Sequence, residues 1–167
     1  MLYLLDANVL IDADRDYYPL ERVPEFWDWL QHAAAAGELK VPQETYDEVT
    51  AGSGDLVDWL KQRDIKRNLL LHEESDPNLV DRVVTTGYAP DLTDIEVNKV
   101  GQDPFLIAYA VARPDERWVI SNEASRPKAQ RANRKVPDVC KTVHVECRNT
   151  FFLIRELNFT TAWRRVR

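Results

Sequence analysis

Acidic side chains close two of the apolar segments of this 167-residue chain. Asp6 follows the run Met1–Leu5, and Asn122 and Glu123 follow the run Trp118–Ser121. Short, wholly apolar runs are typical of strands buried on both faces of a parallel sheet. An acid that ends such a strand must be hydrogen-bonded, paired or bound to a metal. Asp6 is therefore the first residue to which we assign a chemical role.

Two further acids stand where they would meet the same edge of the sheet. Asp103 precedes Pro104 at the start of an apolar helix, and Glu48 lies late in a helix that follows a second strand. Each acid also has a purely structural interpretation: Asp103 can be a helix cap, while Glu48 and Glu123 can be solvated. Ligands of open parallel sheets bind beyond the carboxyl ends of the strands, where all four acids would gather.

Several carboxylates at one edge would raise one another's pKa unless a cation neutralised them. Ligands that are all oxygen favour Mg²⁺ or Mn²⁺. Such an ion can activate water and stabilise the charge that develops on a phosphodiester during in-line displacement. The acids therefore predict metal-assisted hydrolysis.

The elements that must position these acids follow from the pattern of apolar residues and helix signals. Short apolar strands separated by helices predict one domain with a parallel α/β sheet and helices on both faces. Strands are predicted at residues 1–5, 39–41, 118–121 and 143–147. Helices are predicted at 24–36, 42–51, around 56–60, from 76, and at 93–100, 103–112 and 150–157.

Composition places the chain among globular proteins, with 44% apolar residues and only two cysteines. No apolar run approaches the roughly 18 residues of a membrane helix, and we expect a reduced, cytoplasmic environment. The net charge of −6 hides an asymmetry, because residues 124–167 hold 11 basic and 3 acidic residues. Such a basic region predicts a polyanionic ligand, or else a solvated loop and a frayed terminus.

Four segments resemble, in order, the motifs of the PIN-domain ribonucleases. The segment Tyr3–Ile11 is similar to the first strand and acid of that family, and Val41–Val49 to the helix that carries the second acid. Asp103–Ala110 is similar to the third segment, and Val119–Glu123 to the strand with the fourth acid. Further segments resemble a bacterial and archaeal, DUF4411-like subfamily with a PIN-like fold: Tyr17–Pro19, Phe26–Leu30 and Val136–Cys140.

The resemblance implies a single PIN-like domain over residues 1–167, with three α/β/α layers around a parallel sheet of four to five short strands. It implies a Mg²⁺- or Mn²⁺-dependent endoribonuclease that leaves a 5′-phosphate and a 3′-hydroxyl, often the toxin of a type II toxin–antitoxin pair. RNA would be its substrate and an antitoxin protein its partner. The implied catalytic and metal-binding residues are Asp6, Glu48, Asp103 and Glu123, with Asn8, Ser121 and Asn122 around them.

Two positions depart from the family pattern. Ala7 stands where many members carry a hydroxyl residue, and Glu123 follows Asn122 where many carry Gly-Asp. The longer side chain of Glu123 leaves open whether it binds metal directly or through water.

The basic run after the fourth acid is expected to hold the RNA backbone near the metal. Charge reversal of Arg131 and Arg134 should then weaken RNA binding and flatten its salt dependence. The residues assigned to this role are Arg126, Lys128, Arg131 and Arg134.

Other functions remain open at this point. A non-catalytic PIN-like module would bind RNA or a protein with weakened metal affinity. A phosphohydrolase would use Asp6 as a covalent nucleophile. Such an enzyme would carry a second aspartate at position 8, and the presence of Asn8 there argues against this function. A homodimer is a further possibility, for which Trp27 or Trp29 would offer exposed aromatic surface.

Overall fold

Four short parallel strands form the sheet at the centre of the protein, in the order β2-β1-β3-β4. The computed structural model describes residues 1–165. β1 is Leu2–Leu5, β2 is Leu39–Lys40, β3 is Arg117–Ile120 and β4 is Cys147–Arg148. β1 pairs with β2 on one side and with β3 on the other, so that Leu5 lies opposite Ile120. The predicted parallel α/β class is confirmed.

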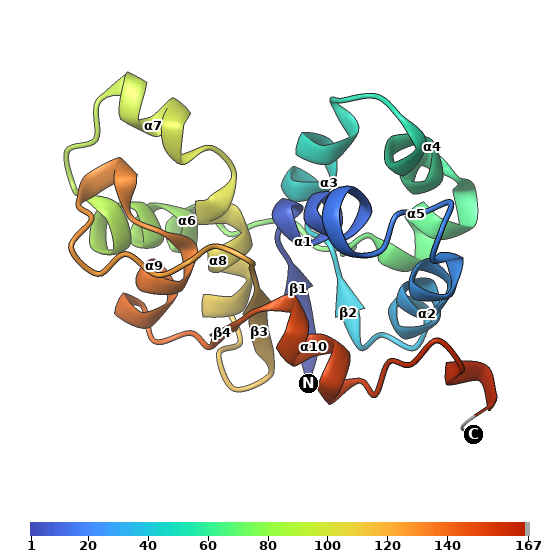
Figure 1. The fold of residues 1–167 in the computed structure, drawn as a ribbon. Coiled ribbons are helices and arrows are strands. Elements are labelled where there is room, and N and C mark those ends of the chain that lie inside the picture. Colours follow the sequence, from blue (N-terminus) through green and yellow to red (C-terminus); the bar gives the residue numbers. More distant parts are fainter. Residues whose placement is uncertain (166–167) are drawn as a thin grey trace.

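Alternation along β1 creates the two cores of a three-layer fold. Side chains of successive strand residues point to opposite faces. Tyr3 and Leu5 pack in one core with the helices from residue 7 to 69, whereas Leu4 packs in a second core with Val119 and the helices on the other face. Figure 1 shows the two groups of helices on either side of the strands.

Ten α-helices surround the sheet in the described part of the chain. Two wider, π-helical turns extend α1 and α6, at Ala13–Tyr17 and Val83–Tyr88. The helices are α1 Ala7–Asp12, α2 Pro24–Ala35, α3 Gln43–Thr50, α4 Asp55–Lys61, α5 Arg63–Leu69, α6 Pro77–Arg82, α7 Asp94–Val100, α8 Asp103–Val111, α9 Val136–Thr142 and α10 Thr150–Glu156.

Helix signals in the sequence correspond to real caps in α6 and α7. The side chain of Asp76 accepts a hydrogen bond from the N–H of Asn78, and Pro77 opens α6. Thr93 and Glu96 form a reciprocal capping box at the start of α7. These interactions satisfy backbone donors that a helix terminus leaves without partners.

The last strand differs from the prediction. β4 covers only Cys147–Arg148 instead of residues 143–147. Val143 is still the cap of α9, and His144 turns the chain with a φ of 62° before it reaches the sheet. The apolar residues Val143 and Val145 pack into the core from this turn, which explains why they resemble a strand in the sequence.

Trp27 and Trp29 are buried, at 2% and 4% exposure, so the interpretation of these side chains as an exposed dimer surface is wrong. The indole N–H of Trp27 donates to the carbonyl of Tyr18, and its ring meets that of Trp59 at 5.0 Å. Both tryptophans contribute to the core between α2 and the sheet. Within residues 1–165, no helix has the length and apolar character needed to cross a bilayer.

Candidate functional site

Asp6 lies at the junction of the two central strands. Its backbone N–H donates to the carbonyl of Ile120, which extends the pairing of β1 with β3 by one step. The side chain is 6% exposed, and its Oδ2 accepts hydrogen bonds from Asn8 Nδ2 at 2.5 Å and from Ser121 Oγ at 2.6 Å. The end of each strand thus supplies one partner of a buried carboxylate.

Asn8 holds the end of β3 against the start of α1. Its amide nitrogen also lies 3.2 Å from Ser121 Oγ, and its Oδ1 accepts the backbone N–H of Asn122 at 2.8 Å. Ser121 Oγ accepts a further hydrogen bond from the N–H of Glu123. The structure therefore brings Asn8 and Ser121 to Asp6, next to the acid whose surroundings they were predicted to form.

The side chain of Asn122 is engaged elsewhere. Its Nδ2 donates to Asp12 Oδ2 at 3.1 Å, and its Oδ1 accepts from both the N–H and the hydroxyl of Thr150. Asn122 thereby ties the end of β3 to α1 and to the first residue of α10. Its side-chain contacts position these elements, and its backbone N–H links it to Asn8.

Glu123 is paired with a lysine from the basic loop. Lys135 Nζ lies 2.5 Å from Glu123 Oε1, and the N–H of Val136 donates to Oε2 at 2.8 Å. Both carboxylate oxygens therefore have partners at the start of α9. Lys135 belongs to the basic run, although it was not among the residues assigned to RNA.

Asp103 is the first residue of α8, and the N-cap position of that helix is held by Gln102. The cap interpretation thus does not account for this residue. Burial raises the pKa of Asp103 to about 8, reinforced by the charges of Asp6, Glu123 and Glu48 and opposed by Lys135. A buried carboxyl with like charges beside it prefers its protonated form.

The pKa of Asp6 is also raised, to about 6. Burial is the main cause, the hydrogen bond from Ser121 opposes it, and the charges of Glu123 and Glu48 add to it. Glu48 lies on α3, where its side chain is more exposed than the others, and partial burial raises its pKa as well. The four predicted acids are therefore electrostatically coupled at the carboxyl end of β1 and β3.

The four acids are of the residue type that binds a divalent cation, but their side chains are not gathered closely enough to hold one. Carboxylate oxygens are the ligands that Mg²⁺ and Mn²⁺ favour, and a cation would remove the repulsion that raises these pKa values. Within residues 1–165, however, no three Asp, Glu, His or Cys side chains are close enough together to hold a metal ion. The residue types therefore fit the ion, whereas their spacing in this structure does not bring three of them together.

Two of the four arginine and lysine residues assigned to RNA are committed to the fold. Arg131 donates to Asp91 and to Glu96, which joins the basic loop to α7. Arg134 donates to the carbonyl oxygens of Gly87 and Asp138 and to Thr142 Oγ1. Charge reversal at either arginine would therefore disrupt structure, which makes it an ambiguous test of RNA binding.

Arg126 and Lys128 have exposed side chains. The backbone N–H of Arg126 donates to Asp138 Oδ2 at 2.6 Å, and Ser125 Oγ donates to Oδ1 of the same carboxylate, which fixes the loop. The guanidinium of Arg126 is thus presented from an anchored backbone. These two residues remain compatible with the predicted role.

A cavity of about 420 Å³ opens beside the carboxylates. Asp103 and Glu123 form part of its wall, and Arg126 and Lys135 belong to the same lining. Tyr88, from the π-helical turn after α6, also lines it and was not identified from the sequence. A tyrosine in an apolar segment carries no signal that separates a core residue from a site residue.

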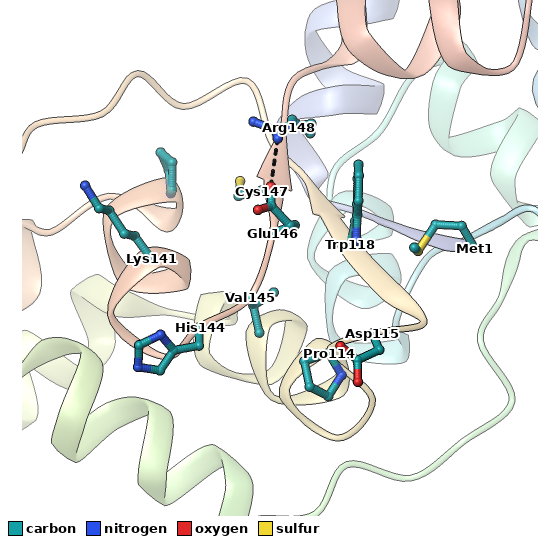
Figure 2. A pocket seen from close by; sticks show the side chains of 11 residues that line it. Met1, Pro114, Asp115, Trp118, Lys141, His144, Val145, Glu146, Cys147 and Arg148 are labelled. Carbon is teal, nitrogen blue, oxygen red and sulfur yellow. Dashed lines mark ion pairs between the residues drawn. The ribbon is translucent and has the colours of Figure 1, made fainter.

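A second cavity, of about 780 Å³, lies elsewhere (Figure 2). Residues before β1 and β3, such as Met1 and Asp115, line it together with β4. Arg148 pairs with Glu146 there and lies 5.7 Å from the centre of the Trp118 ring. This cavity contains none of the predicted site residues.

Comparison with known proteins gives one match. Residues 3–161 match the family described as a domain of unknown function, DUF4411. Neither the curated proteins nor the solved structures include a match to this chain. Since the match spans nearly the whole sequence, from the first strand to beyond the last α-helix, the chain belongs to the DUF4411 family.

Proposed function

We propose that the protein is a Mg²⁺- or Mn²⁺-dependent endoribonuclease with a PIN-like active site. The observation that carries the proposal is the coupling of carboxyl groups from four separate segments at one edge of the sheet. Asp6 and Asp103 are held there with raised pKa values, which a bound cation would lower. Buried like charges with no evident structural role are typical of functional sites.

The residues of the chain have distinct tasks in this proposal. Asp6, Glu48 and Asp103 would hold the ion, which when bound supplies an activated water and neutralises charge on the phosphodiester. Asn8 and Ser121 keep the Asp6 carboxylate in one orientation through Oδ2. Glu123, already paired with Lys135, acts through water or through the placement of the lysine.

The resemblance to PIN-domain ribonucleases adds a biological role and partners to the proposal. A type II toxin with a cognate antitoxin protein and a homodimer remain expectations from that likeness, and a cytoplasmic location remains an expectation from the composition. RNA as the polyanion is favoured by the exposed side chains of Arg126 and Lys128, of which Arg126 lines the cavity beside Asp103 and Glu123.

The decisive experiment compares wild type and Asp6→Asn on a labelled RNA pool with Mg²⁺, Mn²⁺ or EDTA. Asp58→Asn, an exposed position on α4, is the matched control. We expect cleavage by wild type and the control only with metal, and none by Asp6→Asn. Metal-independent cleavage, or cleavage that survives in Asp6→Asn, contradicts the proposal.

A second candidate is a PIN-like binding module without catalysis. The spacing of the acids and the Lys135–Glu123 pair favour it, because both leave the site without a ready-made metal geometry. Calorimetry separates the two functions. A module of this kind would bind RNA or a protein while showing neither Mn²⁺ binding nor cleavage.

A further inference from the structure

Tyr88 carries a buried hydroxyl without a hydrogen-bond partner among residues 1–165. The residue is 6% exposed and lines the cavity of about 420 Å³ beside Asp103 and Glu123. A buried donor left unpaired costs free energy, so a protein keeps few of them. The hydroxyl therefore requires an acceptor that the folded chain itself does not supply.

Cationic side chains dominate the same cavity. Lys99, Arg126, Arg134 and Lys135 line it against the carboxylates of Asp103 and Glu123. Arg134 and Lys99 donate to groups of the fold, Lys99 to Asn133 Oδ1 at 2.6 Å. Within the described residues, no acidic side chain pairs with Arg126. The cavity thus offers an unpaired guanidinium and a hydroxyl donor, together with the lysine that pairs with Glu123.

We propose that this cavity binds a backbone phosphate of the RNA strand, with Tyr88 donating its hydroxyl hydrogen to a non-bridging oxygen. Arg126 and Lys135 supply the neutralising charge. Phosphate oxygens accept from hydroxyl, ammonium and guanidinium donors alike. The inference deepens the proposed function and rests on it for the identity of the polyanion. It adds a positioning subsite next to the acids.

The charge of the lining favours a phosphate over a metal ion in this cavity. Its lining holds four basic and two acidic side chains, a surplus that repels a second cation. Asp103 and Glu123 belong both to this lining and to the coupled acids, so the two sites share a wall. A strand with one phosphate here would lie against Asp103, one of the coupled acids.

The test measures binding of a fluorescein-labelled RNA oligomer by anisotropy in EDTA, where metal-dependent cleavage is absent. Tyr88→Phe keeps the ring and removes only the hydroxyl, and Arg126→Gln removes the charge. Tyr17→Phe and Arg63→Gln, both exposed and outside the cavity, are matched controls. We expect about tenfold weaker binding for each cavity variant, corresponding to one charge-assisted hydrogen bond.

Thermal unfolding of the free protein separates a ligand contact from a structural one. Because the hydroxyl has no partner, Tyr88→Phe should melt at the wild-type temperature or above it. A lower melting temperature together with weaker binding would mean that the hydroxyl supports the fold, and would overturn the inference. Oligomers with and without a 5′-phosphate distinguish a terminal from an internal phosphate, and Tyr88-dependent binding of either supports the site.

Different results would contradict the phosphate subsite and the proposed ribonuclease. Unchanged RNA affinity in Tyr88→Phe, with Asp6-dependent cleavage intact, overturns the subsite and leaves the ribonuclease standing. Tyr88-dependent binding without any cleavage in Mn²⁺ supports the subsite and contradicts the ribonuclease.

Discussion

Lys135 Nζ lies 2.5 Å from Glu123 Oε1, so an ammonium group lies directly beside one of the four coupled carboxyl groups. It opposes the rise in the pKa of Asp103 that the acids and burial produce. Lys135 therefore acts as a resident counter-charge. Its ion pair with Glu123 joins the basic loop to the acidic site.

Removal of this charge should strengthen metal binding. In Lys135→Gln the acids lose a competing cation, and we expect Mn²⁺ affinity to rise about five- to tenfold, the effect of one nearby charge at partly exposed sites. Isothermal titration calorimetry measures it, with the exposed Lys141→Gln on α9 as control. RNA affinity in EDTA should fall in the same variant. Weaker Mn²⁺ binding would show that Glu123 depends on the lysine for its placement.

Ser121→Ala should destabilise the fold through Asp6. The substitution removes a 2.6 Å hydrogen bond to a buried carboxylate and an acceptor for the N–H of Glu123. The expected loss in the free energy of unfolding is about 2 kcal/mol. Urea denaturation measures it, and the exposed Ser53→Ala should leave stability unchanged. Equal stability of both variants would remove Ser121 from the support of Asp6.

The metal-free protein should lose stability as pH rises from about 4 to 8. An unfolded aspartate releases its proton near pH 4, whereas folded Asp103 keeps it to about pH 8 and Asp6 to about pH 6. Between those limits the folded state binds more protons, so rising pH favours unfolding by up to about 1.4 kcal/mol per unit and group.

Denaturation in EDTA at pH 5 to 8 checks this slope. Asp103→Asn should flatten it between pH 6 and 8, and Asp58→Asn should keep the wild-type slope. An unchanged slope in Asp103→Asn would contradict the assignment of the raised pKa to this carboxyl.

Gly87→Ala should be costly because the residue packs directly on α9. A Cβ at Gly87 would lie 2.6 Å from Val139 Cγ1, a separation that requires a shift of the core. Overpacking of this kind costs about 1–3 kcal/mol. Gly52→Ala is the matched control, since its Cβ would meet only Val49 O at 3.5 Å. Thermal melting compares them, and equal melting temperatures would refute the close approach.

The fold was predictable where the sequence carries strong local signals. The apolar run before Asp6 and the prolines at the starts of α2, α6 and α8 mark elements that the structure contains. Three helices, α1, α5 and α9, were not predicted. α1 continues directly from a strand, α5 follows α4 after the single residue Gln62, and α9 contains two valines. β-branched residues favour strands, and the packing of α9 against α8 overrides that preference.

The gathering of the acids was predictable in outline, because the carboxyl ends of parallel strands meet at one edge. Their partners were not. Spacing says nothing of which loop lysine reaches Glu123, or that Arg131 pairs with acids around α7. Tyr88 could not be singled out, because what marks it is a buried hydroxyl without a hydrogen-bond partner among residues 1–165, and a sequence does not show this.

The order of the strands has a consequence for synthesis. β1 is made first, yet its neighbour β3 begins at residue 117, and the lysine that faces Glu123 comes at residue 135. A nascent chain on the ribosome therefore carries Asp6 without the strand that orients it until residues 117–120 have been made. If the edge of this sheet cuts RNA, a growing polypeptide has not assembled that edge before residue 135 has emerged.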